Sequence, residues 1–506
     1  MTIEKTLFAA ADKMRGSMDP GEYKHVALGL LFLRYIGTAF QRKYDELLPE
    51  GKEVAEDVDE YLAEGIFWVP EAARWKTLAA NAKDPGIGVK VDNAMRAIEA
   101  DNEQLKGALP KVFGREALDP AIVTGLIDLF SNIEFDGTPK DFDLIGRIYE
   151  YFISEFASNE GKRGGDFHTP KPVVELIVQM IEPVKGRLYE PCHGSGSFMV
   201  QSEHFLEAHK YRRADLAIYG QERNHTTYGL ARMNLAIRGI VARLEWNAEG
   251  TLLRDAFPDE KFDYVMANPP FNVSDWSGDI LAEDRRWKFG TPPVGNANFA
   301  WMQHIYDKLG STGVAGVVMA NGSMSSMSSG EGDIRRAMVE AEAVDAMIAL
   351  PGQLFYGTQI PACVWILAKD KSNGVAKDAK LRDRRGAVLF LDARKMGALV
   401  PGSRKQKELS SEEITRIATA YHAWRGEPDA GAYADEPGFC KAVSMEEIAK
   451  HNFVLTPGRF VGAGAAEEDD EPFEEKFDRL TAELRAQFAE GRRLEREIEA
   501  RLEGLA

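Results

Sequence analysis

The segment Asn268-Pro269-Pro270-Phe271 places an amide, two prolines and an aromatic ring in direct succession. It follows a short apolar run, residues 264–267, which predicts a buried strand that ends where the prolines remove backbone donors and fix φ. Asn268 is therefore expected at the carboxyl end of a strand. In open α/β sheets this is the end at which ligands bind.

An amide followed by prolines suits methyl transfer to a planar exocyclic amine. The lone pair of such a nitrogen is delocalised into its ring, so the nitrogen is a poor nucleophile. The Asn268 side-chain oxygen and the Pro269 backbone carbonyl could hold its two hydrogens and favour a localised lone pair. Phe271 offers a face for a base that has left its stack. A plain turn that terminates a strand is the alternative.

A glycine turn lies further toward the N-terminus. Gly194-Ser195-Gly196 follow an apolar run that ends at Glu190 and precede a predicted helix over 197–209. Glycines let backbone amides approach a ligand closely, next to the positive end of a helix. The turn is a weak signal by itself, because many loops contain such glycines and the pyrophosphate pattern G-x-G-x-x-G is absent.

Two acidic residues strengthen the reading of a nucleoside site. Glu222 ends the apolar run 216–222, where a carboxylate commonly accepts hydrogen bonds from ribose hydroxyls. Asp255 follows what we interpret as a third strand, "GTLL", and could accept from an adenine amine while Phe257 covers the ring. Glu222 alone would be read as a surface carboxylate. Together the four strand ends favour a nucleoside without phosphate, such as S-adenosylmethionine.

The elements that position these residues form three predicted regions. Residues 1–150 show helical apolar spacing without strand alternation, which predicts a helical domain. Over 151–460, apolar runs alternate with helical patterns, which predicts an α/β domain with a mostly parallel sheet. The predicted strands are "GRLYEPC", "LAIYGQE", "DYVMAN", "GVAGVVMAN", "VDAMIAL", "ACVWILAK" and "AVLFLDA".

The last region, 461–506, combines a small-residue, acidic linker with a terminal helix. An apolar seam at heptad-like spacing favours contact with a partner surface, although packing against the same chain is the alternative. The seam consists of Phe473, Phe477, Leu480, Leu484, Leu494, Ile498 and Leu505.

Composition sets further bounds. The chain has 506 residues and a net charge of −18, so a strong grip on DNA by this chain alone is not expected. Its three cysteines form neither a disulfide framework nor a metal spacing, and the histidines show no ligand pattern, so we expect no metal. No apolar run has membrane-spanning length and no signal core begins the chain. We expect a cytoplasmic protein.

As a set, "DFHTP", "EPCHGSGSF", "YGQERN", "RDAF" and "ANPPFN" resemble the amino-methylating DNA methyltransferases that use S-adenosylmethionine. More narrowly, the chain resembles the modification (M) subunit of type I restriction-modification systems, over most of its length. The resemblance implies a Rossmann-like class I S-adenosylmethionine-dependent methyltransferase core with an N-terminal helical domain and a C-terminal helix. It also implies adenine-N6 methylation of a base that is flipped out of double-stranded DNA.

The resemblance also implies roles for individual residues. Asn268, Pro269, Pro270 and Phe271 would hold the target base. Glu190 stands where the family more often has Asp, His193 where Cys is common, and Ser197 where Gly is usual. The implied cofactor-binding residues are Phe167, His168, Thr169, Pro170, Glu190, Gly194, Ser195, Gly196, Glu222, Asp255 and Phe257.

Partners follow from the same resemblance. The segment 461–506 is too short for a DNA-reading domain, which suggests that a separate specificity subunit recognises the target. The implied assembly has two M subunits and one specificity subunit, and a restriction subunit can join it. Alternatives remain: methylation of cytosine N4, of a protein glutamine or of an RNA amine, and a catalytically silent scaffold.

One loop, 282–305, carries Arg285, Arg286 and Lys288 beside Trp287. These side chains could meet phosphates or a base. A solvated surface loop accounts for them equally well.

Overall fold

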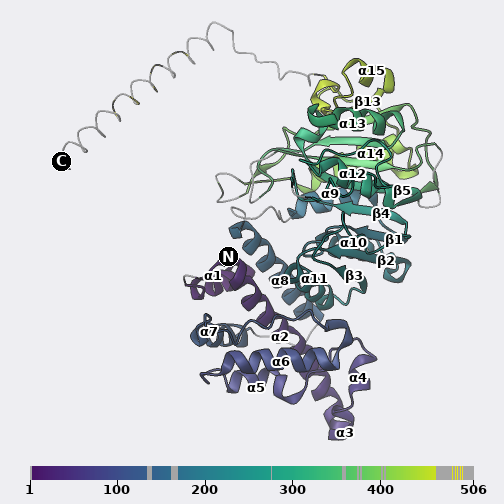
Figure 1. Cartoon of the computed structure of the whole chain (residues 1–506). Helices are drawn as coiled ribbons and strands as arrows, with labels where there is room; N and C mark the ends of the chain where they lie inside the picture. Colours follow the sequence, from purple (N-terminus) through teal and green to yellow (C-terminus); the bar gives the residue numbers. More distant parts are fainter. Residues whose placement is uncertain are drawn as a thin grey trace.

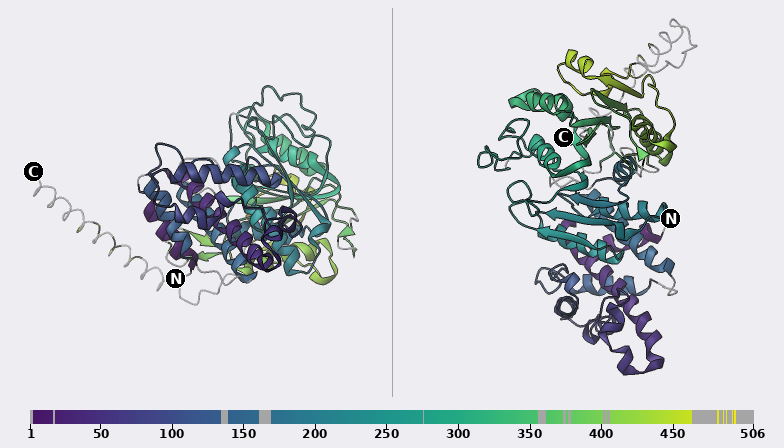
Figure 2. Two further views of the ribbon diagram at one scale, coloured as in Figure 1. Left: turned by 90° about the horizontal axis from the view of Figure 1, so that it is seen from below. Right: turned by 90° about the vertical axis from the view of Figure 1, so that its right-hand side faces the viewer.

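The computed structural model describes residues 3–16, 18–133, 139–160, 169–274, 276–355, 361–372, 375–376, 379–400, 403, 406–462 and a few single positions beyond 480. A helical part and a part built around a large sheet follow one another along the chain. Figures 1 and 2 show them at opposite ends of the molecule. The residues of the predicted C-terminal seam, from Phe473 to Leu505, lie outside the described residues.

The first part contains only helices within its described residues, as the periodicity predicts. Its longest helix, α2, starts at Pro20 behind the cap Asp19, whose side chain accepts from the Gly21 N–H, and buries most of one face. The helices are α1 (Ile3–Met14), α2 (Pro20–Leu47), α3 (Lys52–Ala55), α4 (Val58–Leu62), α5 (Trp75–Ala80), α6 (Ile87–Asp101), α7 (Pro120–Ser131) and α8 (Pro139–Glu160).

Helix α8 crosses the position at which we predicted the domain boundary. Phe152 and Phe156, both beyond residue 150, pack edge-to-face with Phe8 of α1 in the same apolar core as α2 and α7. Because Phe152 and Phe156 pack in this core, α8 belongs with the helical part at least as far as residue 156.

The second part is a twisted mixed sheet, which among the described residues has nine strands in the order β13-β10-β6-β7-β5-β4-β1-β2-β3. Five neighbouring strands of this sheet run parallel to one another in the order β5-β4-β1-β2-β3, as in doubly wound folds. Strands β7 and β13 are antiparallel to their neighbours. Its strands are β1 (Gly186–Glu190), β2 (Leu216–Glu222), β3 (Ala242–Trp246), β4 (Phe262–Ala267), β5 (Leu309–Ala320), β6 (Val344–Ala349), β7 (Ala362–Ala368), β10 (Ala387–Asp392) and β13 (Cys440–Ser444). The α/β prediction is confirmed.

The seven apolar runs from "GRLYEPC" to "AVLFLDA" all form strands, but "GTLL", interpreted as the third strand along the chain, does not. The run "GTLL" forms a turn at residues 250–253, and the third strand is β3, whose sequence "ARLEW" alternates charged with apolar residues. Such alternation is typical of an edge strand, which needs no continuous apolar run. Asp255 therefore follows a turn and not a strand.

Helices cover both faces of the sheet. One face packs against α9 (Lys171–Ile181), α10 (Ser197–Ala208) and α14 (Ser411–Arg425). The other packs against α12 (Asn298–Lys308), α13 (Glu331–Glu340) and α15 (Met445–Lys450). Short two-residue strands form two further ladders, β8 (Val375–Ala376) with β9 (Ala379–Lys380) and β11 (Ala398–Leu399) with β12 (Lys407–Glu408).

Helix α11 (His225–Ile237) joins the two parts. Its Leu230, Met233 and Ile237 are buried in the apolar core of the helical part. Gly229 of the same helix lies so close to the segment before α7 that a Cβ there would stand 2.6 Å from the Ala108 carbonyl oxygen. The two parts therefore share one packed interface.

Among the described residues, no helix combines the length and the apolar character that crossing a bilayer requires.

The close approach at Gly229 gives a stability prediction. Gly229→Ala should lower the free energy of unfolding by roughly 1–3 kcal/mol, because the added methyl meets backbone that cannot rotate away. Gly146→Ala in α8 is the matched control, since a Cβ there meets its nearest atom at 3.8 Å. That variant should be neutral or slightly stabilising. Denaturant unfolding of both variants measures the difference; equal stability would contradict the close packing.

Candidate functional site

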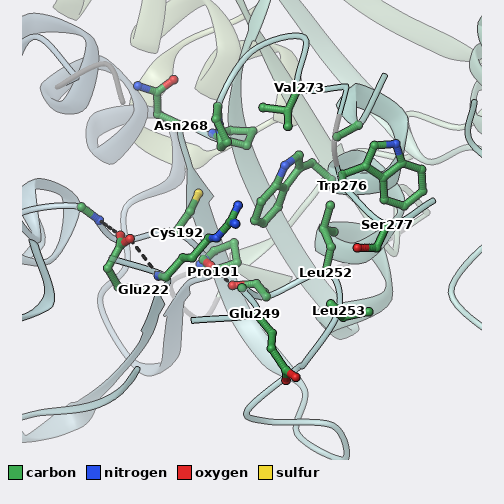
Figure 3. A pocket seen from close by; sticks show the side chains of 18 of the residues that line it. Pro191, Cys192, Glu222, Glu249, Leu252, Leu253, Asn268, Val273, Trp276 and Ser277 are labelled. Carbon is green, nitrogen blue, oxygen red and sulfur yellow. Dashed lines mark hydrogen bonds between the residues drawn. The ribbon is translucent and has the colours of Figure 1, made fainter. Parts of the chain in front are cut away.

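A cavity of about 310 Å³ opens at the carboxyl ends of β1, β2 and β4 (Figure 3). This is the size range of a small-molecule site. Its wall comes from the ends of these strands, from the turn at 249–253 and from the loop between β4 and α12. The lining residues are Pro191, Cys192, Gly194, Glu222, Arg223, Thr227, Glu249, Gly250, Thr251, Leu252, Leu253, Asn268, Pro269, Pro270, Val273, Trp276, Ser277, Ala297 and Trp301.

The glycine turn leads from β1 into α10. Gly194 and Gly196 have φ values of 55° and 79°, the left-handed region that glycine adopts without strain. Ser195 is fixed behind the turn, because its carbonyl accepts from the Asn234 amide at 2.8 Å. Of the three turn residues, Gly194 lines the cavity, whereas Ser195 and Gly196 do not.

Glu190 ends β1 beneath this turn and is only 3 % exposed. Its Oε2 has no hydrogen-bond partner among the described protein atoms. Burial raises its pKa well above the usual carboxyl range, and the neighbouring Glu222 raises it further. A buried carboxylate oxygen beside a second carboxylate is suited to a cationic or hydrogen-donating ligand.

Glu222 is held by the backbone on three sides. Its Oε2 accepts from the Gly194 N–H at 3.0 Å, and its Oε1 accepts from the Arg223 and Asn224 N–H groups, each at 2.8 Å. Burial raises its pKa, although these hydrogen bonds act in the opposite direction. The carboxylate is therefore rigid and lies at the cavity wall (Figure 3).

Asn268 lies where β4 ends, at the rim of the same cavity. Its amide nitrogen donates to the Thr169 hydroxyl at 2.9 Å. Thr169 and Pro170 immediately precede α9, so this bond joins the "HTP" segment to the "NPPF" segment across 99 residues of chain. Phe167 and His168, predicted to act with Thr169, lie outside the described residues.

The loop after Asn268 is stiffened beyond its prolines. Asn272 has a φ of 55°, and its backbone N–H and side-chain oxygen bond the Asn298 side chain at 3.0 and 2.8 Å. Phe271 is partly buried and meets Phe355 edge-to-face at 6.2 Å. The ring thus joins the loop after β4 to the segment after β6.

The outer wall of the cavity is aromatic and was missed by sequence reasoning. Leu252, Trp276, Ala297, Ala300 and Trp301 form a small apolar cluster. The two tryptophans come from the loop after β4 and from α12, and both line the cavity. The presence of Trp276 and Trp301 could have indicated an aromatic wall, but their proximity arises only when the loop folds.

Asp255 and Phe257 do not line the cavity. Asp255 is ion-paired with the buried Lys308, and its Oδ1 accepts from the Phe257 N–H at 2.9 Å. Phe257 is 1 % exposed and packs edge-to-face with Tyr189 and Tyr219 in the core. The structure therefore offers no surface of Phe257 to a ring in this cavity, because the turn at 250–253 occupies the place that we assigned to a strand end.

A separate group of buried side chains resembles a metal cluster in composition. Ligand atoms of Glu182, His422 and Glu427 lie within 4.8 Å of one another. Glu427 also contacts the Arg425 guanidinium at 3.2 Å, and the His422 Nε2 pairs with the Gln179 carbonyl at 2.8 Å. These partners account for the cluster as a buried ion-pair network.

Comparison with known proteins gives the family. A family model described as N-6 DNA Methylase matches residues 140–469, and one described as HsdM N-terminal domain matches residues 3–130. The type I restriction enzyme HindI methylase subunit of Haemophilus influenzae is 44 % identical over 86 % of this chain and 99 % of its own. The type I restriction enzyme MjaIX methylase subunit of Methanocaldococcus jannaschii is 35 % identical over 99 % and 91 %.

Solved structures agree with this. The type I restriction-modification system methyltransferase subunit from Streptococcus thermophilus superposes with a TM-score of 0.76 at 27 % identity, covering 91 % of this chain and all of that one. The chain belongs to the N-6 DNA methylase family, among the modification subunits of type I restriction-modification systems. The fold class predicted from the motifs is confirmed, with S-adenosylmethionine as the methyl donor of this class.

Cys192 gives a chemical test of the cavity. It is partly exposed and lines the cavity, while Cys363 and Cys440 are buried. Burial raises the pKa of the Cys363 thiol to about 12, and it also raises the pKa of Cys440. N-ethylmaleimide should therefore modify Cys192 first, and S-adenosylmethionine should slow that reaction. Peptide mass spectrometry of the native chain measures both rates. If S-adenosylmethionine does not slow the modification of Cys192, the cofactor binds outside this cavity.

Proposed function

We propose that this chain transfers a methyl group from S-adenosylmethionine to N6 of an adenine in double-stranded DNA, at a site chosen by a separate specificity subunit. The observation that carries the proposal is the bond between Asn268 and Thr169 at the rim of a cavity that Glu222 also lines, with Glu190 buried at the end of β1. It joins the segments proposed to bind the base and the cofactor, at the carboxyl edge of the sheet.

The cavity fits the cofactor in the chemistry of its groups. S-adenosylmethionine supplies a methyl group on a positively charged sulfonium, together with an ammonium, a carboxylate and ribose hydroxyls. Glu222 would accept from the hydroxyls, and Glu190, with its unpartnered buried oxygen, would accept from the ammonium. The left-handed turn at Gly194, Ser195 and Gly196 leaves backbone room for the methionine end. Two buried carboxylates favour a ligand with cationic groups.

Leu252 and Trp301 would cover the adenine of the cofactor, since both line the cavity. They replace the predicted pair Asp255 and Phe257 in this role. Asp255 would act indirectly, because it anchors the end of α12 through Lys308. Thr169 and Pro170 complete the site at the start of α9.

Asn268 would hold the target amine. The Thr169 hydroxyl fixes the orientation of the Asn268 amide by accepting from its nitrogen, so that the carbonyl oxygen is presented as an acceptor. With the Pro269 carbonyl it would hold the two amine hydrogens and localise the lone pair for attack. Pro270 keeps the loop rigid, and Phe271 provides the stacking face for the flipped base. No general base is required in the attacking step.

Other subunits would complete the enzyme. The relatives are named as subunits of type I restriction enzymes, and the net charge of −18 leaves the basic DNA surface to a partner. We propose an assembly of two such chains with one specificity subunit, which a restriction subunit can join, working in the cytoplasm. In this assembly the helical part, which extends past residue 150 through Phe152 and Phe156 of α8, and the terminal region, 461–506, would supply docking surfaces around the part built on the sheet.

The Asn268–Thr169 bond can be tested by substitution. Asn268→Ala should lower the rate of methyl transfer by about two to three orders of magnitude, because an acceptor for the amine is lost. Thr169→Val should lower it by roughly tenfold, because the Asn268 amide is no longer fixed, while Thr169→Ser should retain most of it. The assay follows labelled methyl into N6-methyladenosine, with the chain alone and with its specificity subunit.

The controls for this assay are S-adenosylmethionine binding and the unfolding midpoint, which should stay close to those of the wild type in Asn268→Ala. Activity of Asn268→Ala at the wild-type level would refute the catalytic assignment. Label in cytosine would move the proposal to N4 methylation, and label with the chain alone would show that it reads DNA unaided.

Glu222 gives a pH prediction. The ionised carboxylate is the form that accepts from ribose hydroxyls, and burial raises its pKa above the ordinary value of 4.5. Affinity for S-adenosylmethionine should therefore fall as the pH is lowered through that raised pKa, at a higher pH than an exposed Glu would require. Glu222→Gln should bind about tenfold more weakly at pH 7.5 and lose this part of the pH dependence. Isothermal titration calorimetry from pH 5 to 8 measures the affinity of both proteins for S-adenosylmethionine. Identical pH profiles for the wild type and Glu222→Gln would contradict the role of Glu222.

A further inference from the structure

Arg286 lies in the loop that the sequence suggested as a DNA contact, but its side chain points inward. It is 7 % exposed, whereas its neighbour Arg285 is exposed and donates to the Pro258 carbonyl at 2.9 Å. The loop therefore presents one arginine to solvent and keeps the other inside. A buried guanidinium requires acceptors for its donors, and four hydrogen bonds supply them here.

The Arg286 guanidinium bonds three separate segments. Its Nε and Nη2 each donate to the Asp284 carboxylate at 2.8 Å, within the loop. Its Nη2 also donates to the Leu252 carbonyl, in the turn that lines the cavity. Its Nη1 donates to the His304 Nδ1 at 3.0 Å, on α12. One side chain thus ties the loop to two other pieces of the cavity wall.

The neighbouring groups favour this arrangement. Burial lowers the pKa of His304 well below its usual value, and the charge of Arg286 lowers it further, so the ring is neutral and can accept at Nδ1. Burial alone would raise the pKa of Asp284, but hydrogen bonds from Arg286 outweigh it and the net shift is downward. Asp284 thus remains ionised opposite the guanidinium.

The tryptophans of the wall surround the same side chain. The guanidinium carbon lies 5.0 Å from the centre of the Trp287 ring, which meets Trp276 edge-to-face at 5.9 Å. His304 in turn meets the Trp301 ring at 6.3 Å. Trp276 and Trp301 line the cavity, whereas Arg286 does not. Arg286 is therefore placed behind the aromatic wall, within reach of every segment that builds it.

We infer that Arg286 is a positioning residue for the cofactor, which holds Leu252, Trp276 and Trp301 in place as the wall that covers the adenosine. The inference rests on the proposed function, since it takes this cavity as the S-adenosylmethionine site. It predicts that Arg286 acts on cofactor affinity and not on DNA affinity, although it is a basic residue in a loop next to the catalytic segment.

The test compares Arg286→Ala with Arg285→Ala, a matched control one position away. Arg286→Ala should bind S-adenosylmethionine about tenfold more weakly or worse, because charged hydrogen bonds that fix the wall are lost. Its KM for the cofactor should rise accordingly, while kcat at saturating cofactor changes by less than about threefold. Arg285→Ala should stay within about twofold of the wild type in all three quantities.

DNA binding separates this inference from the alternative. The complex with the specificity subunit should bind its DNA equally well with either variant when the cofactor is saturating. Normal cofactor affinity in Arg286→Ala would overturn the inference, and normal cofactor affinity with weakened DNA binding would show instead that the side chain serves DNA. Loss of kcat without a change in KM would indicate a merely structural role and would also overturn it.

Two milder variants keep the test decisive if Arg286→Ala does not fold. Arg286→Lys retains the positive charge but loses the planar guanidinium with its several donors. Asp284→Asn retains the shape of the side chain but loses the charged acceptor. Both should raise the KM for the cofactor, by less than Arg286→Ala. If neither does, the inference is wrong. If the wild type itself fails to bind S-adenosylmethionine, the proposed function fails first.

Discussion

The parallel pairing of β1 with both β2 and β4 is the constraint on which the rest of the site depends. Glu190 pairs in register with Gly220, and Tyr189 pairs with Val265, so the three strands end at nearly the same level. Glu190, Glu222 and Asn268 are brought to one edge by this register alone. A slip of one residue would turn each side chain to the opposite face, because side chains alternate along a strand. The apolar layers on both faces oppose such a slip.

Electrostatics at this edge follow from the register. Burial raises the pKa values of both carboxyl groups, and the charge of Glu222 raises the pKa of Glu190 further. Three backbone N–H groups offset part of the cost at Glu222. A ligand with a sulfonium and an ammonium would offset the rest of the cost of burying the two carboxyl groups. The backbone register, which places both carboxyl groups at this edge, would therefore favour a cationic ligand there.

Sequence reasoning predicted the parts of the fold that depend on local pattern. The central strands are continuous apolar runs, and the glycine turn and the double proline mark where β1 and β4 end, so these elements could be read directly. The edge strand β3 could not, because its residues alternate and its apolar content is low. That error displaced the expected adenine contacts to Asp255 and Phe257, which the structure places behind the cavity.

The aromatic wall was unpredictable for a different reason. Trp276, Trp287 and Trp301 are separated by loop residues without periodicity, and only tertiary packing brings them together. Sequence alone shows a basic loop after the Asn268-Pro269-Pro270-Phe271 segment, and the exposure of each side chain cannot be predicted from a pair of adjacent arginines. Only tertiary contacts decide that Arg285 faces solvent and Arg286 does not.

The shared interface at α11 limits how the molecule can be divided. The helix begins directly after the ribose-binding candidate Glu222, through the cap Asn224, and buries Leu230, Met233 and Ile237 against the helical part. A fragment that contained only the sheet and its own helices would expose this apolar stripe to water. The two family matches, residues 3–130 and 140–469, therefore correspond to parts that are joined by one shared apolar core.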